Sequence, residues 1–185
     1  MNIKKITNIG VLSALSFILM ILIKFPIIPS MPFLLYDPGD IPILVISFLY
    51  GPIPALIATF IGSVLMALFT GLGGPYGAIM HFMATGALVT TAGFIYKKYH
   101  SKKGAIFGLS AGTLAMTLIM IPANLFITPI YLGLTRQQIY PLLWSGIIPF
   151  NIIKASINSG ITILVYKKIA SFLREKGLLP SLENV

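Results

Sequence analysis

Residues 146–172 read GIIPFNIIKASINSGITILVYKKIASF, an apolar run that is long enough to cross a lipid bilayer. A transmembrane helix needs about 20 predominantly apolar residues. The composition of the whole chain agrees, because its 185 residues are 57% hydrophobic and only 9% charged. Soluble domains are about 25% charged. A soluble domain is therefore excluded, and a polytopic membrane protein of one domain over residues 1–185 is predicted.

Five further apolar segments extend this prediction to an all-α, six-transmembrane-helix bundle. The segment at 40–50 is too short to cross a membrane alone, and Gly51 and Pro52 separate it from the next run. A broken pair of helices and one long span both fit, and the glycine and proline favour the pair. The predicted spans are 6–24, 40–50, 53–69, 78–96, 104–132 and 146–172.

The basic residues predict the orientation of these spans. Ten of them lie in the N-terminus, the loop at 97–103 and the C-terminal tail, whereas the opposite loops hold Lys24 and Arg136. Cytoplasmic loops of membrane proteins carry the excess of lysine and arginine. We therefore expect a multi-pass protein of the cell membrane with both termini in the cytoplasm, and not a nucleic-acid-binding protein, despite the net charge of +9.

Lys154 is the residue of the last span that needs an explanation. Asn151 precedes it by three residues and Asn158 follows it by four, so one helix face carries an amide, an ammonium group and a second amide. Such a face is expected to point into the protein rather than into lipid. Because no acidic residue is expected in the interior of the membrane, a bound ligand is the expected partner of Lys154. Snorkelling of the lysine to the outer interface is the alternative.

Other polar residues inside the spans are candidates of lower specificity. Asn124 follows Pro122 in the fifth span and fits either a ligand contact or an interhelical hydrogen bond. His81 and Thr85 lie one turn apart in the fourth span, where a helix–helix hydrogen bond is expected. Tyr131 fits the outer aromatic belt or the lining of a pocket. With no cysteine and no second histidine nearby, neither a metal site nor a cofactor is predicted.

Asp37 and Asp40 share a predicted outer loop. Asp40 is expected to be the N-cap of the helix that follows, and Asp37 before Pro38 suits a turn. An intramembrane enzyme using the two acids is an alternative function. The loop offers no nucleophile, however, so no catalytic residue is assigned and a protein without enzymatic activity is expected.

The chain resembles the substrate-binding S components of energy-coupling factor vitamin transporters, and within them the riboflavin-specific branch. Its motifs are LYDPGDIP at 35–42, NLFITPIY at 124–131 and PFNIIK at 149–154. The resemblance implies an outward-facing substrate pocket and high-affinity riboflavin binding. It also implies uptake together with a module of one transmembrane coupling subunit and two cytoplasmic ATPases. The chain itself has no phosphate-binding loop. The alternatives within the family are another vitamin or flavin phosphate.

The resemblance also implies roles for particular residues. Small residues at Gly10 and Ala14 fit either packing within the bundle or docking of a separate membrane subunit, and the resemblance implies docking of the coupling subunit. The loop with Leu35 and Tyr36 resembles the lid of the family, and His81 stands where the family commonly has asparagine. The predicted ligand contacts are Leu35, Tyr36, Asp37, His81, Thr85, Asn124, Tyr131, Asn151 and Lys154, of which Asn124, Asn151 and Lys154 are implied as hydrogen-bonding residues of the flavin.

Overall fold

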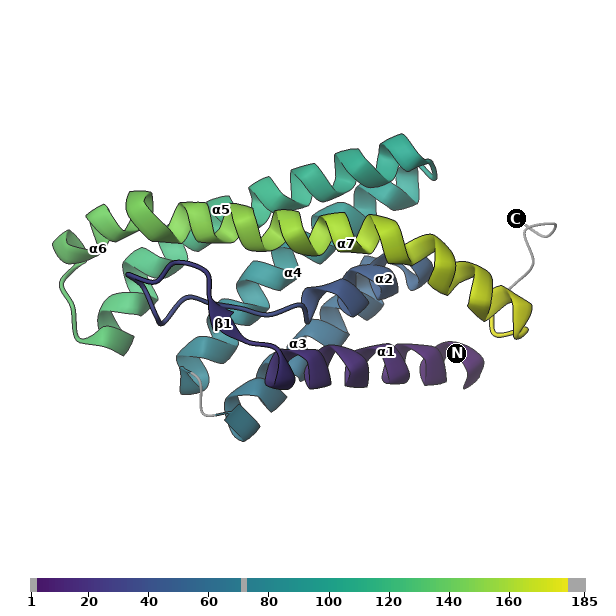
Figure 1. The fold of residues 1–185 in the computed structure, drawn as a ribbon, viewed down its shortest axis with the longest axis horizontal. Helices are drawn as coiled ribbons and strands as arrows, with labels where there is room; N and C mark the ends of the chain where they lie inside the picture. The colour runs from purple at the N-terminus through teal and green to yellow at the C-terminus, as the bar shows by residue number, and fades with distance from the viewer. Residues whose placement is uncertain (1–2, 71–72, 180–185) are drawn as a thin grey trace.

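The structure, a computed structural model, describes residues 3–70 and 73–179 and confirms an all-α chain. Its long helices run along one axis of an elongated molecule (Figure 1). A π-helical turn, η1, joins the short α6 to α7, so these three form one continuous helical segment. The helices are α1 (Ile3–Leu22), α2 (Asp40–Tyr50), α3 (Pro52–Thr70), α4 (Gly74–Lys98), α5 (Lys102–Leu132), α6 (Arg136–Leu142), η1 (Leu143–Ile147) and α7 (Ile148–Glu175).

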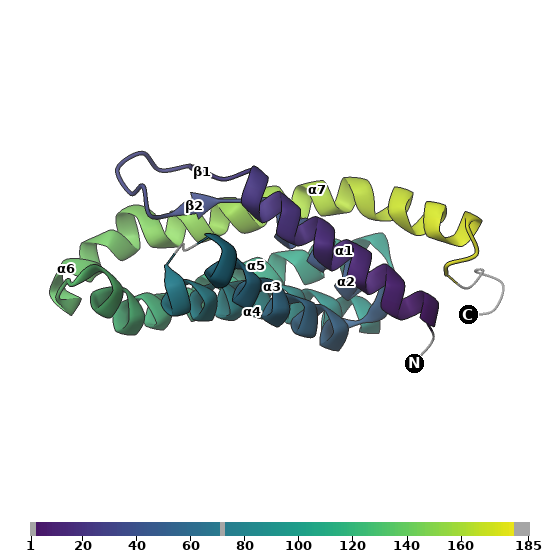
Figure 2. The same ribbon diagram turned by 90° about the horizontal axis from the view of Figure 1, so that it is seen from below.

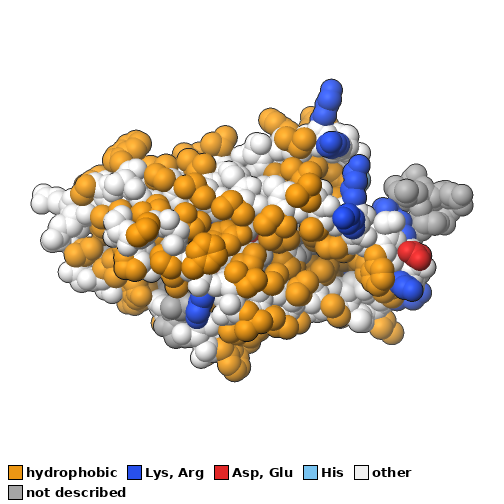
Figure 3. Space-filling view, viewed as in Figure 1, with side chains coloured by type: hydrophobic (Ala, Val, Ile, Leu, Met, Phe, Trp, Pro, Cys, Tyr) orange, Lys and Arg blue, Asp and Glu red, His pale blue; other side chains and the backbone are white. Residues whose placement is uncertain are grey.

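The surface is that of a membrane protein. Five helical segments among the described residues are long and apolar enough to cross a bilayer: α1, α3, α4, α5 and Arg136–Glu175. Large apolar side chains point outward from them, such as Leu22, which is 74% exposed, and Leu164, which is 72% exposed. Figure 3 shows an apolar middle, with lysine and arginine gathered at the end where α1 begins and α7 ends. The predicted membrane protein is therefore confirmed, while the count of six crossings stays a prediction.

The short helix α2 lies inside the bundle. It has 11 residues and packs against α1, α3, α4 and α7. Gly51 ends it with φ of 96°, a left-handed conformation that glycine adopts without strain. Pro52 then begins α3, as suits a residue without a backbone N–H. The chain thus forms two helices here, which is the arrangement that the glycine and proline favour.

A two-stranded hairpin connects α1 to α2. The strand β1 (Phe25–Pro26) pairs antiparallel with β2 (Leu35–Tyr36). Figure 2 shows the hairpin lying beside the first half of α7. Met31, in the loop between the strands, is buried, and a Cβ placed on Gly146 of η1 would collide with its side chain. The hairpin loop is therefore fastened to the helix that carries Asn151 and Lys154.

Candidate functional site

A cavity of about 270 Å³ lies beneath the hairpin. It is slightly smaller than the 300–1,000 Å³ typical of small-molecule pockets. Residues of α1, the hairpin, α3, α4, α5 and α7 line it. Five methionines give it an apolar wall that adapts easily to a ligand, because methionine is flexible and polarisable. They are Met20, Met66, Met80, Met116 and Met120.

One wall of the cavity is the polar face of α7. Asn151 and Lys154 line the cavity and are 3% and 5% exposed, and Asn158, deeper in the bundle, is 0% exposed. The face therefore points into the protein, as its spacing predicts. The side chain of Asn151 donates one hydrogen bond to the carbonyl of Ile147, at 2.7 Å. A side-chain amide has two N–H groups and an acceptor oxygen, so it has further capacity for a ligand.

Lys154 has a protein partner. Its Nζ donates to Asp37 Oδ2 at 2.6 Å, and both side chains are almost fully buried. The expectation that no acid would be available to Lys154 was wrong. The physical reason is that the segment after β2 enters the bundle instead of lying outside it, so Asp37 sits at the level of the polar face. Asp37 also accepts a hydrogen bond from the backbone N–H of Gly39, which is the turn expected before the helix.

Asp40 is the first residue of α2 and is 0% exposed. Its side chain makes no capping hydrogen bond; the N-cap position belongs to Gly39, so the predicted N-cap was wrong. The carboxylate instead accepts hydrogen bonds from Thr85 Oγ1 at 2.7 Å and from Asn158 Nδ2 at 3.0 Å. Asp40 therefore ties α2 to α4 and α7.

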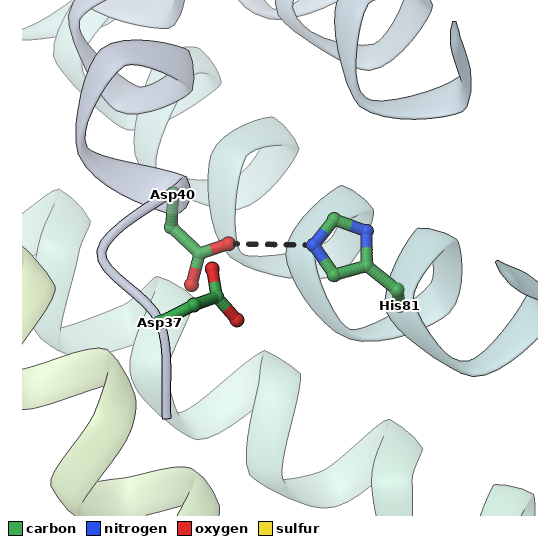
Figure 4. Close-up of side chains that lie close together, drawn as sticks. All are labelled: Asp37, Asp40 and His81. Carbon is green, nitrogen blue, oxygen red and sulfur yellow. Dashed lines mark ion pairs between the residues drawn. The ribbon is translucent and has the colours of Figure 1, made fainter. Parts of the chain in front are cut away.

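His81 lines the cavity beside these acids. Its Nδ1 is 2.7 Å from Ser63 Oγ, and its Nε2 points at Asp40 Oδ1, 3.9 Å away (Figure 4). Ligand atoms of Asp37, Asp40 and His81 lie within 4.8 Å of one another, a grouping that could hold a metal ion. Sequence reasoning missed it because His81 lies on α4, far along the chain from the segment that carries the two acids. The Lys154 ammonium already neutralises Asp37 and would repel a divalent ion, so we assign no metal.

The fifth helix contributes a regular stripe to the cavity. Met116, Met120, Asn124 and Thr128 all line it, and their spacing of four places them on one helix face. Asn124 donates to the carbonyl of Met120 and accepts from Thr128 Oγ1, both at 2.8 Å. This spacing is visible in the sequence and would have pointed to the two methionines and Thr128, which the sequence analysis did not select.

Eight of the nine predicted ligand contacts line the cavity, and Tyr36 does not. Successive side chains of a strand point to opposite faces, so Leu35 reaches the cavity while Tyr36 turns away from it. The ring of Tyr36 packs on Phe25 at a centroid distance of 5.3 Å, and its hydroxyl donates to Asn158 Oδ1 at 2.9 Å. Tyr36 thus fastens the hairpin to α7. The ligand role of the other residues stays a prediction.

The predicted docking residues lie on the outer face of α1. Gly10 and Ala14 are both exposed. A Cβ built on Gly10 would meet nothing within 4 Å. The face therefore has room for a second helix to approach closely.

Comparisons with known proteins place this arrangement in a family. A family model described as "ECF transporter, substrate-specific component" matches residues 4–166. The riboflavin transporter RibU of Staphylococcus aureus (strain TCH60) is 37% identical over 177 residues, covering 92% of this chain and 93% of that protein. The riboflavin transporter FmnP of Bacillus subtilis (strain 168) is 30% identical over 186 residues, covering 95% of this chain and 97% of that protein.

A solved structure gives the same result at the level of the fold. It is described as "Structure and mechanism of the S component of a bacterial ECF transporter". It matches with a TM-score of 0.81 and 37% sequence identity, over 92% of this chain and 97% of that one.

Proposed function

Because the chain belongs to the substrate-specific components of ECF transporters, we propose that it is the riboflavin-binding subunit of such a transporter. It is a transporter component and not an enzyme. The observation that carries the proposal is that Asn124, Asn151 and Lys154 line one cavity, in a chain 37% identical to a riboflavin transporter. This cavity is the proposed riboflavin site.

The chemistry of the cavity suits a flavin. Riboflavin is uncharged, with a broad apolar ring system and a polar imide edge. The methionine side chains of α1, α3, α4 and α5 offer an apolar surface to the ring. The amides of Asn124 and Asn151 offer both donors and acceptors, which is what the N–H and carbonyl groups of an imide need.

Lys154 can donate a hydrogen bond to the ligand while it stays paired with Asp37. An ammonium group has three N–H donors, and the bond to Asp37 Oδ2 uses one of them. The carboxylate holds the ammonium at the cavity wall, where a remaining N–H can reach a carbonyl or ring nitrogen of the flavin. Asp37 is then a positioning residue for Lys154.

The hairpin is the proposed lid. Pro32, Phe33, Leu34 and Leu35 cover the cavity from this segment. We infer that these residues close over the flavin from the outer side of the membrane. The charge asymmetry supports that side, because it predicts both termini and the loop at 97–103 in the cytoplasm.

Uptake then requires partners. The proposed partners are a transmembrane coupling subunit, which docks on the exposed face of Gly10 and Ala14, and two cytoplasmic ATPases that supply the energy. Six crossings are proposed for this subunit, with the short helix α2 and the helix α3 as two separate crossings joined by a tight turn at the inner face.

The test is the visible absorbance of the protein purified in detergent, followed by quenching of riboflavin fluorescence. We expect flavin bands that survive gel filtration. Lys154→Ala and Asn151→Ala should each weaken riboflavin binding by at least about tenfold, the effect of losing one hydrogen bond to a charged or buried group. Lys103→Ala is the matched control, because Lys103 is exposed and does not line the cavity.

A colourless wild-type protein that leaves added riboflavin fluorescence unquenched would contradict the proposal and redirect the search to another vitamin. Flavin phosphate is the second candidate, because Lys24 lines the cavity and offers a charge to a phosphate. Competition between riboflavin and its phosphate separates the two. A preference for the phosphate that disappears in Lys24→Gln would identify the phosphate as the ligand.

A further inference from the structure

The buried charges at the cavity wall do not balance when His81 is neutral. The Asp37 carboxylate is compensated by the Lys154 ammonium at 2.6 Å. The hydrogen bonds that the described residues give to the Asp40 carboxylate come from Thr85 and Asn158, which are uncharged. Asp40 is 0% exposed, and an uncompensated carboxylate in such a place is unfavourable. The cluster therefore lacks one positive charge.

His81 is placed to supply that charge. Its side chain is only 8% exposed, and its Nε2 points at Asp40 Oδ1. Among the described residues this nitrogen has no hydrogen-bond partner. Figure 4 shows the imidazole directed edge-on at the two carboxylates. A proton on Nε2 of a positively charged imidazole would need only a small approach of the two groups to form a charged hydrogen bond with Asp40.

Ser63 lets His81 gain a second ring proton, on Nδ1, without a rearrangement of heavy atoms. The Ser63 hydroxyl lies 2.7 Å from His81 Nδ1 and 2.8 Å from the carbonyl oxygen of Thr59. In the neutral state the hydroxyl can donate to Nδ1, while Nε2 carries the ring proton. When the ring is protonated on both nitrogens, Nδ1–H donates to Ser63 Oγ and the hydroxyl donates to the Thr59 carbonyl. Nδ1 therefore has a hydrogen-bond partner in both protonation states of His81.

We propose that His81 and Asp40 form a proton-binding site, and that a proton enters it when riboflavin fills the cavity. The inference rests on the proposed function. His81, Thr85 and Asp37 line the cavity, so an apolar ring displaces the water that would solvate the cluster's excess negative charge. Loss of that solvation favours the neutral, protonated cluster. Because linkage is reciprocal, the proton in turn strengthens riboflavin binding.

Among the ionisable groups of this cluster, His81 is the one that we expect to take up the proton. Asp37 and Lys154 form a pair that is charged in both states. Tyr36 reaches the same network through Asn158, and its hydroxyl donates a hydrogen bond there. Between about pH 5 and pH 8, imidazole is the side chain that titrates at its ordinary pKa.

The experiment measures riboflavin affinity by fluorescence quenching across that range of pH. It also measures proton uptake by calorimetry in buffers of different ionisation enthalpy. We expect the affinity of the wild type to rise by up to about tenfold for each unit that the pH falls, with uptake of up to about one proton per riboflavin. His81→Asn keeps an N–H donor but cannot titrate, so its affinity should not vary with pH. The control is His100→Asn, because His100 is the second of the chain's two histidines and is exposed; this variant should keep the wild-type slope.

Affinity that is independent of pH in the wild type, or a slope that survives in His81→Asn, would overturn the proton site. A dependence that a chelator abolishes and a divalent metal restores would also overturn it, in favour of a metal ion. Failure of the wild type to bind riboflavin at any pH would instead refute the proposed function. The proton site would then be tested by nuclear magnetic resonance of the ligand-free protein. An imidazole titration that is present in the wild type and absent from His81→Asn would support the site, and the lack of such a titration in the wild type would refute it.

Discussion

At the scale of single residues, Lys154 has a structural role that is separate from its proposed contact with the ligand. Its ammonium and the carboxylate of Asp37 are 7% and 12% exposed and lie 2.6 Å apart. Removing one partner of a buried ion pair leaves an unpaired charge and costs about 3–5 kcal/mol, whereas replacing both partners by uncharged groups costs far less. Stability and binding therefore respond differently to the same set of substitutions.

We predict that Lys154→Met lowers the free energy of unfolding by about 3–5 kcal/mol, because Asp37 is left buried without a counter-charge. The double variant Asp37→Asn/Lys154→Met should recover most of this loss and still bind riboflavin at least about tenfold more weakly than the wild type, since the ammonium is absent. Thermal unfolding in detergent and fluorescence quenching measure the two effects. A double variant as unstable as Lys154→Met would show that the pair is not the source of the instability.

The sequence predicted the polar face of α7 but not its partner. The spacing of Asn151, Lys154 and Asn158 identifies one helix face without knowledge of the fold, and all three are buried. The bond from Lys154 to Asp37 joins residues 117 positions apart. It depends on where the chain runs after β2, and the pattern of residues in the predicted outer loop does not show that this segment enters the bundle.

At the scale of the elements, the hairpin between α1 and α2 is held at three places. Tyr36 donates to Asn158 on α7, and Asp37 accepts from Lys154. Met31 is 4% exposed and packs against Gly146, which has no side chain and so leaves room for it. The first two contacts anchor the base of the proposed lid, so the contact of Met31 with η1 controls the position of its loop.

We predict that Gly146→Ala displaces the lid, because the added Cβ collides with the Met31 side chain. The colliding atoms are the flexible end of the Met31 side chain, so we expect a cost near the lower end of the about 1–3 kcal/mol that overpacking causes. If the cost falls on the closed lid, riboflavin should dissociate at least several-fold faster. Stopped-flow fluorescence measures the dissociation rate. Met31→Ala/Gly146→Ala makes room for the new methyl group and should restore the closed position of the loop. A rate that stays fast in the double variant would contradict this arrangement.

The elements themselves were predictable to different degrees. The long apolar runs gave α1, α3, α4, α5 and α7 within a few residues, because hydrophobic length is a strong signal for a membrane helix. The π-helical turn η1 was not foreseen; most of it falls between the predicted spans 104–132 and 146–172. A π-turn depends on how one extra residue is accommodated between neighbours, which no local pattern in this segment reveals.

At the scale of the whole molecule, the chain separates a buried polar site from an apolar outer surface. The cavity lies toward one end of the bundle, beneath the hairpin, and most of the lysine and arginine side chains visible in Figure 3 gather at the other end. The predicted docking residues Gly10 and Ala14 lie near the middle of α1 and precede Met20, the residue of α1 that lines the cavity. Substrate binding and partner docking should therefore be separable by mutation.

We predict that Gly10→Leu abolishes riboflavin uptake in cells while the purified variant keeps its riboflavin affinity. The leucine has space in the isolated subunit, since a Cβ at Gly10 meets nothing within 4 Å, but it prevents the close approach of a partner helix. Gly160→Leu is the matched control, because Gly160 is an exposed glycine of α7 with equally open surroundings. It should leave both uptake and affinity unchanged. Equal loss of uptake in the two variants would mean that a large side chain anywhere on the outer surface impairs uptake. The α1 face would then not be a specific docking site.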